Sequence, residues 1–369
     1  MTVAGSGASR VAIVLLSTLG CAVKPGRRYG HRSDWRELLL EGCHPDMLPS
    51  TCNASKFANR DARLPPLSPF AKRYLDLVEL TATGSLNDET GECHPESFWL
   101  PKRAKKGGNC FITSSERFVP MRRLVGDDWP TVGFTMVGHA GLHNVRVALE
   151  TVYAGNVPGD FAEFGVWRGG TALYAKACVD ALDHAAGFQG TTRNIFLFDA
   201  FGEISGYHEA TAYLQTDEDE VKHMFDKYAL LDDHVHFVKG MFKDTLPVFK
   251  KQRPNTQFAV LRVDGNFYET YQDVLYHFYE SVPVGGVVIL DDIGSVTRRF
   301  RPGTVRDFWE QFSRDNDIPE KFLQVDRNRA FFVKTKKVKI DWSFYEKHAV
   351  NNAKYKSLGG EKAKKATAA

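Results

Sequence analysis

The sequence has 369 residues, enough for two or three domains or for one α/β domain with an added segment. Hydrophobic residues make up 43% and charged residues 25%, which excludes a wholly disordered or fibrous chain. The 48 Lys and Arg residues nearly balance the 45 Asp and Glu residues, and the net charge is +3. This balance gives no reason to expect a nucleic-acid partner.

The first apolar segment, residues 11–23, is shorter than the ~18 residues that a transmembrane helix needs. It follows Arg10, and Gly20 and Ala22 supply small residues where a signal peptidase could cut. Residues 1–23 therefore have the form of a secretory signal peptide or signal-anchor, with a buried strand or a disordered leader as the alternative. We expect a membrane contact only if this segment is a signal-anchor.

Four cysteines, Cys43, Cys52, Cys93 and Cys110, follow this segment, and a glycosylation sequon begins at Asn53. An even number of cysteines beside a sequon agrees with an oxidising compartment, although the spacing matches no metal-ligand pattern. Together with the N-terminal segment, these features favour the secretory pathway over the cytoplasm.

Residues 24–69 lack periodicity and are predicted to form an irregular leader, and residues 70–130 to form a helical cap that begins with a helix at Phe70. Strands and helices then alternate over residues 131–345. The expected strands are 160–166, 194–198, 234–238, 258–263 and 286–290, and the expected helices are 142–154, 171–182, 218–228, 244–250, 268–281 and 304–313. This alternation predicts a doubly wound, mostly parallel sheet, and the close pair 322–325 and 330–333 predicts an antiparallel edge hairpin. Residues 346–369 are predicted to be a disordered tail.

A glycine-rich turn with the sequence EFGVWRGG, residues 163–170, ends the first strand of this series. Glycines let the backbone turn tightly beside a ligand, and the next helix offers its N-terminal N–H groups. The pattern is neither GxGxxG nor a Walker motif, and a plain tight turn is the alternative. Asp199 ends the second strand, where a carboxylate can accept hydrogen bonds from the ribose hydroxyls of a nucleoside.

Three carboxylates, Asp264, Asp291 and Asp292, follow two further strands. The carboxyl ends of parallel strands form the edge where open α/β sheets bind ligands. Converging carboxylates repel one another unless a cation neutralises them, and oxygen ligands select a hard ion such as Mg²⁺. Helix caps or solvated loops are the alternative positions for these aspartates.

Several motifs in order resemble the macrocin-type O-methyltransferases, which use S-adenosylmethionine and Mg²⁺ to methylate sugar hydroxyls. The resemblance covers about residues 70–340. The motifs are RYLDL at 73–77, EFGVWRGG at 163–170, YALLDD at 228–233, GMFKDTLP at 240–247, VDGNFYET at 263–270 and GGVVILDD at 285–292. The resemblance implies a Rossmann-like class I methyltransferase fold.

Carried over by position, the resemblance assigns three groups of residues. It implies an S-adenosylmethionine site lined by Thr135, Glu163, Gly165, Trp167 and Gly169, with Asp199 on the ribose. It implies Mg²⁺ ligands at Asp264, Asp291 and Asp292, and a histidine base for which His208 lies closest, with a solvated loop histidine as the alternative. The metal chemistry also allows Asp264 itself to act as the base. The expected acceptor is a small-molecule or glycan hydroxyl within a vicinal diol, and a homo-oligomer is compatible with the family.

Departures from the family pattern keep other functions open. Ala200 replaces a usual Ser after the ribose-binding acid, and Asn266 replaces the second acid of AspGlyAsp. A catechol-type O-methyltransferase would use the same metal chemistry on a phenolic diol. A non-catalytic binding protein with this fold is the alternative from another class, and a nicotinamide dehydrogenase would favour the GxGxxG turn that is missing here.

Overall fold

The computed structural model describes residues 65–88, 91–92, 118, 120–126, 128–202, 214–265, 267–293, 304–326 and 328–347. Several predictions fall outside these residues. They concern the N-terminal segment 1–23, most of the leader, most of the tail, and Cys43, Cys52, Asn53, Cys93, Cys110, His208 and Asn266. Within the described part of the chain, no helix combines the length and apolar character needed to cross a membrane.

The centre of the fold is a seven-stranded sheet with the strand order β5-β4-β3-β6-β7-β9-β8. Neighbours from β5 to β7 run parallel, and β9 and β8 add antiparallel pairs. The strands are β3 (Asp160–Phe164), β4 (Ile195–Asp199), β5 (Val235–Lys239), β6 (Phe258–Val263), β7 (Val287–Leu290), β8 (Leu323–Gln324) and β9 (Ala330–Val333). The predicted parallel sheet with an antiparallel edge hairpin is confirmed.

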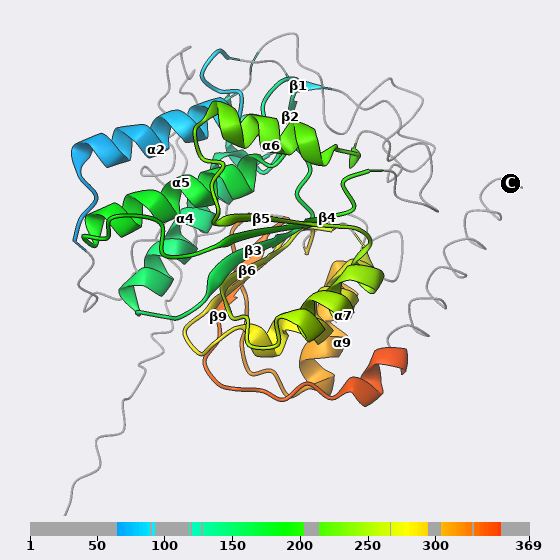
Figure 1. Cartoon of the computed structure of the whole chain (residues 1–369). Coiled ribbons are helices and arrows are strands. Elements are labelled where there is room, and N and C mark those ends of the chain that lie inside the picture. The colour runs from blue at the N-terminus through cyan, green and yellow to red at the C-terminus, as the bar shows by residue number, and fades with distance from the viewer. Residues whose placement is uncertain are drawn as a thin grey trace, which may run out of the picture.

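Helices cover both faces of this sheet (Figure 1). One face is covered by α4 (Gly138–Ala154), α5 (Gly170–Ala185) and α6 (Glu218–Lys227), with α2 (Pro69–Ala82) packed on α5, and the other by α7 (Phe242–Gln252), α8 (Tyr268–Phe278) and α9 (Val305–Asp315). Successive side chains of a strand point to opposite faces, so Phe161 joins the first hydrophobic cluster while Ala162 and Phe164 join the second. Two apolar layers therefore bury the parallel strands on both sides.

Short elements complete the described chain. They are α3 (Pro120–Val125), the two-residue antiparallel pair β1 (Gly91–Glu92) and β2 (Trp129–Pro130), and the 3₁₀ helices η4 (Tyr279–Ser281) and η6 (Trp342–Phe344). The sequence did not predict β1 and β2, because two residues carry no periodic pattern.

Some boundaries differ from those expected. Helix α4 begins at Gly138, four residues before the predicted start, and Gly138 has φ +65°. A Cβ there would lie 2.3 Å from the carbonyl oxygen of Arg123, so only glycine fits between α3 and α4. Strand β3 ends at Phe164 rather than at 166, because the backbone turns at Gly165, with φ +90°.

Candidate active site

The turn after β3 is built around glycines with left-handed backbone conformations. Gly165 and Gly169 have φ +90° and +82°, and Trp167 between them has φ +48°. A Cβ on Gly165 would lie 1.7 Å from the carbonyl oxygen of Asp264, and one on Gly169 would lie 2.5 Å from Cγ1 of Val221. The chain is thus packed tightly against the end of β6 and against α6, and side chains are excluded at both positions.

Asp199, at the end of β4, stabilises this turn by accepting hydrogen bonds from its backbone. Its Oδ2 accepts hydrogen bonds from the backbone N–H groups of Val166 at 2.7 Å and Trp167 at 3.4 Å, and its Oδ1 accepts one from Phe201 at 3.0 Å. Burial raises the pKa of Asp199, and these backbone bonds oppose the shift by favouring the charged form. The carboxylate assigned to the ribose therefore holds the glycine turn, and the ribose contact stays a prediction.

Thr135 lies against the start of α5, on the other side of the turn. Its hydroxyl is 2.9 Å from that of Thr171, and its backbone N–H donates to the carbonyl of Ala82 at the end of α2. The backbone N–H of Gly170 donates to the carbonyl of Phe134 at 2.9 Å. These bonds join the end of α2, the segment before α4 and the glycine turn into one wall of the site.

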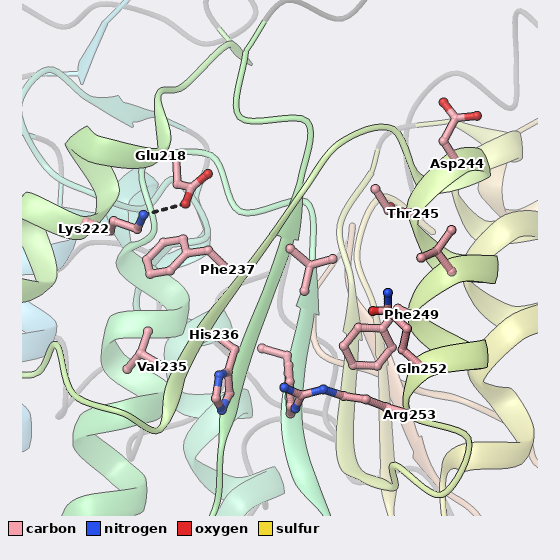
Figure 2. A pocket seen from close by; sticks show the side chains of 13 residues that line it. Glu218, Lys222, Val235, His236, Phe237, Asp244, Thr245, Phe249, Gln252 and Arg253 are labelled. Carbon is pink, nitrogen blue, oxygen red and sulfur yellow. Dashed lines mark ion pairs between the residues drawn. The ribbon is translucent and has the colours of Figure 1, made fainter.

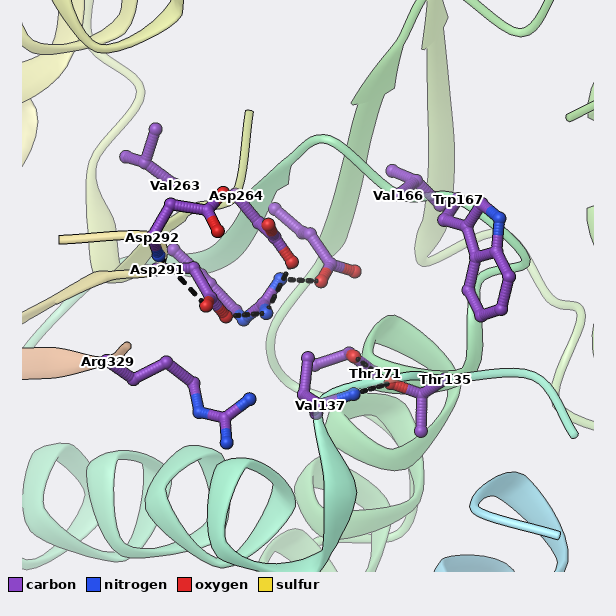
Figure 3. A network of polar contacts seen from close by, with 12 residues as sticks. Thr135, Val137, Val166, Trp167, Thr171, Val263, Asp264, Asp291, Asp292 and Arg329 are labelled. Carbon is purple, nitrogen blue, oxygen red and sulfur yellow. Dashed lines mark hydrogen bonds and ion pairs between the residues drawn. The ribbon is translucent and has the colours of Figure 1, made fainter. Parts of the chain in front are cut away.

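A buried arginine in β6 stands at the centre of the acidic cluster. Arg262 is 2% exposed, and the strand register places it directly beside Glu163 of β3. Its Nη1 lies 2.5 Å from Oε1 of Glu163, while Nη2 lies 2.7 Å from Oδ2 of Asp264 and 2.6 Å from Oδ2 of Asp291. Figure 3 shows Asp264 and Asp291 converging there. One guanidinium thus binds carboxylates at the ends of three neighbouring strands.

Burial opposes ionisation of the acids around this arginine. Burial raises the pKa of Glu163 to about 8 and outweighs the opposing charge of Arg262. Burial and then the charge of Asp291 raise the pKa of Asp264 to about 6. Glu163 is buried, and its Oε2 has no hydrogen-bond partner among the described residues. The site therefore has capacity for a further positive charge or hydrogen-bond donor.

Asp291 and Asp292 follow β7 in a constrained conformation. The backbone N–H of Asp292 donates to Oδ1 of Asp291 at 3.0 Å, and Asp292 has φ +54°. The hydroxyl of Tyr271 donates to the carbonyls of both Val263 and Asp291, which ties the ends of β6 and β7 together. Among the described residues, no group of three His, Cys, Asp or Glu side chains is arranged to hold a metal ion.

A second buried arginine, Arg329, lies at the start of β9 near Asp291 (Figure 3). Its Nη2 donates to the carbonyl of Val125 at 2.8 Å and pairs with Asp326. Its Nε has no partner within the described part of the chain. Sequence reasoning missed both arginines, although a charged residue inside the apolar strand 258–263 was a usable signal for Arg262.

The comparisons with known proteins agree with this geometry. A family model described as Macrocin-O-methyltransferase (TylF) matches residues 71–334. The chain belongs to this family. The family match and the fold shared with a solved O-methyltransferase identify an O-methyltransferase that depends on S-adenosylmethionine.

Two curated relatives are similar over most of their own length. Demethyldecarbamoylnovobiocin O-methyltransferase of Streptomyces niveus is 34% identical over 227 residues, which are 58% of this chain and 80% of the relative. Mycinamicin III 3''-O-methyltransferase of Micromonospora griseorubida is 34% identical over 231 residues, 60% of this chain and 86% of the relative. Among solved structures, that of the O-methyltransferase NovP has a TM-score of 0.58 and 30% identity, covering 72% of this chain and all of that one.

Proposed function

We propose that this O-methyltransferase methylates a hydroxyl of a glycosyl group on a small molecule. The observation that carries the proposal is the acidic cluster around Arg262, at the carboxyl ends of β3, β6 and β7, directly beside the glycine turn. This is the edge of an α/β sheet that receives ligands. The names of two relatives, demethyldecarbamoylnovobiocin O-methyltransferase and mycinamicin III 3''-O-methyltransferase, support an acceptor of this class.

The residues around the turn fit S-adenosylmethionine. Gly165, Trp167 and Gly169 shape the turn, Thr135 closes one wall, and Asp199 supports it from β4. The buried Oε2 of Glu163 lacks a partner among the described residues, and a carboxylate there suits the positively charged methionine portion of the cofactor. We propose these residues as the cofactor site.

Asp264, Asp291 and Asp292 are our proposed Mg²⁺ ligands. Their oxygen donors suit a hard cation, and burial, followed by the charge of Asp291, raises the pKa of Asp264 even with Arg262 beside it. Bound Mg²⁺ would lower the pKa of an acceptor hydroxyl and favour acceptors with two neighbouring oxygens, as in a vicinal diol. Arg262 meanwhile fixes one oxygen each of Asp264 and Asp291, so it orients both carboxylates.

The proton of the acceptor hydroxyl has to leave during methyl transfer. We propose Asp264 or His208 as the general base that takes it, a contribution of about 10²–10⁴-fold. Asp264 lies within the cluster, whereas His208 is outside the described residues. Thr135 and the glycine turn would hold the cofactor so that its methyl group lies between the acceptor oxygen and the departing sulfur, because displacement needs that alignment.

Calorimetric titration of the full chain with S-adenosylhomocysteine, with and without Mg²⁺, tests the cofactor site. Micromolar binding is expected. A folded sample that binds in neither condition would leave a non-catalytic protein with a methyltransferase fold. A panel of glycosylated natural products and catechols then tests the acceptor, since turnover of catechols alone would replace the sugar acceptor with a phenolic one.

Replacement Asp292→Ala tests the metal separately. We expect it to abolish turnover while S-adenosylhomocysteine still binds, because the proposed metal site and cofactor site use different side chains. Full activity of this variant without added metal would refute the Mg²⁺-dependent mechanism.

A further inference from the structure

The glycine turn carries an arginine that the proposed mechanism does not use. Arg168 is half-buried and stands between Trp167 and Gly169, the N-cap residue of α5. Backbone N–H groups at the start of a helix carry partial positive charge, so a cation beside them is unfavourable for the helix. The stability of α5 therefore gives no reason for a cation here, and the reason has to lie in the groups that Arg168 contacts.

Backbone carbonyls converge on one nitrogen of this side chain. Nη1 of Arg168 donates to the carbonyls of Pro130 at 3.0 Å, Thr131 at 3.0 Å and Gly133 at 3.1 Å. Two residues after Gly133 the chain reaches Thr135, which closes one wall of the proposed cofactor site. Among the described residues Arg168 makes no ion pair, so these carbonyls take the place of a carboxylate. The arginine thus fixes segment 130–133 against the glycine turn.

The same guanidinium stacks on the indole of its neighbour. Cζ of Arg168 lies 4.4 Å from the centroid of the Trp167 ring, within the range of a cation–π interaction. The Trp167 ring also contacts that of Trp129 in β2, with centroids 6.2 Å apart and planes tilted by 53°. Arg168 and Trp129 therefore both restrict the orientation of this indole.

Trp167 adopts a backbone conformation that needs such support. Its φ of +48° is in the left-handed region, which is strained for a bulky residue and persists only where the surroundings impose it. Asp199 holds the backbone by accepting from the N–H of Trp167 at 3.4 Å, and Arg168 holds the side chain. Figure 3 shows the indole turned toward the segment that carries Thr135. The position of this ring thus depends on the arginine beside it.

We propose that Arg168 is a positioning residue for methyl transfer, which sets the orientation of the Trp167 ring and aligns it with segment 130–133 before S-adenosylmethionine binds. Groups that are held in place in the free protein lose less entropy when the ligand binds, so the alignment raises affinity for the cofactor. This inference rests on the proposed function, because Trp167 and Thr135 are part of the proposed cofactor site. Arg168 acts through Trp167 and has no direct part in the chemistry.

Calorimetric titration of the full chain with S-adenosylhomocysteine tests the inference. We expect Arg168→Met to weaken binding about tenfold or more, because it removes the stacked cation and the bonds to the carbonyls. Arg168→Lys keeps a cation but not a planar face, so an intermediate loss is expected. Thermal melting followed by circular dichroism establishes that each variant is folded at the temperature of the titration.

The chain offers a matched control at another stacked arginine. Cζ of Arg253 lies 5.5 Å from the ring centroid of Phe196 and 5.8 Å from that of Phe249. Arg253 lines a groove between α6 and α7, outside the glycine turn (Figure 2). Arg253→Met should therefore leave the affinity for S-adenosylhomocysteine unchanged. Equal weakening by this variant would overturn the inference, because the loss of any stacked arginine would then have the same effect.

A double-variant comparison tests the route through the indole. In a Trp167→Ala background, Arg168→Met should change the affinity by less than about twofold, because the ring that it positions is already absent. A loss as large as in the wild-type background would overturn the inference, since the arginine would then act by another route.

The titration also distinguishes failure of the inference from failure of the proposed function. A folded wild-type chain that does not bind S-adenosylhomocysteine would overturn the cofactor site, and the role of Arg168 with it. Wild-type binding that Arg168→Met leaves within about twofold would overturn the role of Arg168 alone. If Arg168→Met does not fold, Arg168→Lys decides, and wild-type affinity of that variant would overturn the inference.

Discussion

Removing the guanidinium of Arg262 should destabilise the fold more than removing any exposed charge. The residue is 2% exposed and binds Glu163, Asp264 and Asp291 at 2.5 to 2.7 Å. Breaking a buried ion pair by deleting one partner costs about 3–5 kcal/mol, because the other charge stays buried without compensation. We expect a loss in this range for Arg262→Met, which keeps much of the side-chain volume.

The chain offers two matched controls for this substitution. Arg262→Lys keeps the charge but cannot present two nitrogens in a planar fork, so we expect an intermediate loss. Replacing Asp264 and Asp291 by Asn in the Arg262→Met background removes the uncompensated charges, and this variant should regain part of the lost stability. Urea unfolding at pH 7, followed by circular dichroism, gives the free energy of unfolding of each variant.

A free energy of unfolding for Arg262→Met within about 0.5 kcal/mol of the wild type, the range of ordinary surface substitutions, would refute this prediction. The prediction also fails if the Asp264→Asn and Asp291→Asn replacements destabilise the Arg262→Met protein further. In that event the stabilisation would come from packing around the arginine stem rather than from its charge.

Three further predictions concern the turn and its acids. Gly165→Ala should abolish folding, since its Cβ would lie 1.7 Å from the carbonyl oxygen of Asp264. The control Gly187→Ala, at φ +87° in open space, should lower the free energy of unfolding by only about 1–2 kcal/mol. Similar melting temperatures for the two variants would contradict this prediction. The folded pKa of Glu163, about 8, exceeds the ordinary value of 4.5, so its contribution to stability is complete below pH 4.5 and is lost as pH rises through 8. Urea unfolding at several pH values gives the dependence of the free energy of unfolding on pH. Glu163→Gln should reduce its decline with rising pH by up to about 1.4 kcal/mol per pH unit. An unchanged dependence would count against the raised pKa of Glu163. Asp199→Asn should weaken calorimetric binding of S-adenosylhomocysteine about tenfold through loosening of the turn, and unchanged affinity would show that the turn is held by other contacts.

The sheet could be predicted because its parallel strands are short apolar runs separated by helical patterns. Segment 258–263 has this form and became β6, and the close pair of strands near residue 330 became the antiparallel edge. The start of α4 could not be predicted, because Gly138 and Gly141 are poor helix formers. Tertiary packing decides there, since Gly141 is buried beside the side chain of Val137.

The acidic edge was predictable in part. Strand ends meet at one edge of a parallel sheet, which placed Asp264 and Asp291 together without a structure. The contact of Glu163 with Arg262 depends on the register between β3 and β6, where the two residues are direct neighbours. Strands buried on both faces have no polar side that would reveal this register from the sequence.

Arg262 changes the argument for a metal at this edge. Converging carboxylates require a cation, and the fold supplies one of its own in Arg262, which binds Asp264 and Asp291 together with Glu163. A Mg²⁺ site at this edge therefore depends on the negative charge of the carboxylates that Arg262 leaves unbalanced. Burial, and after it the charge of Asp291, still raises the pKa of Asp264 to about 6 despite the guanidinium 2.7 Å away. Arg262, with Arg329 close to Asp291, offsets part of the repulsion among the carboxylates at this edge, and a divalent ion would act on the negative charge that is left over.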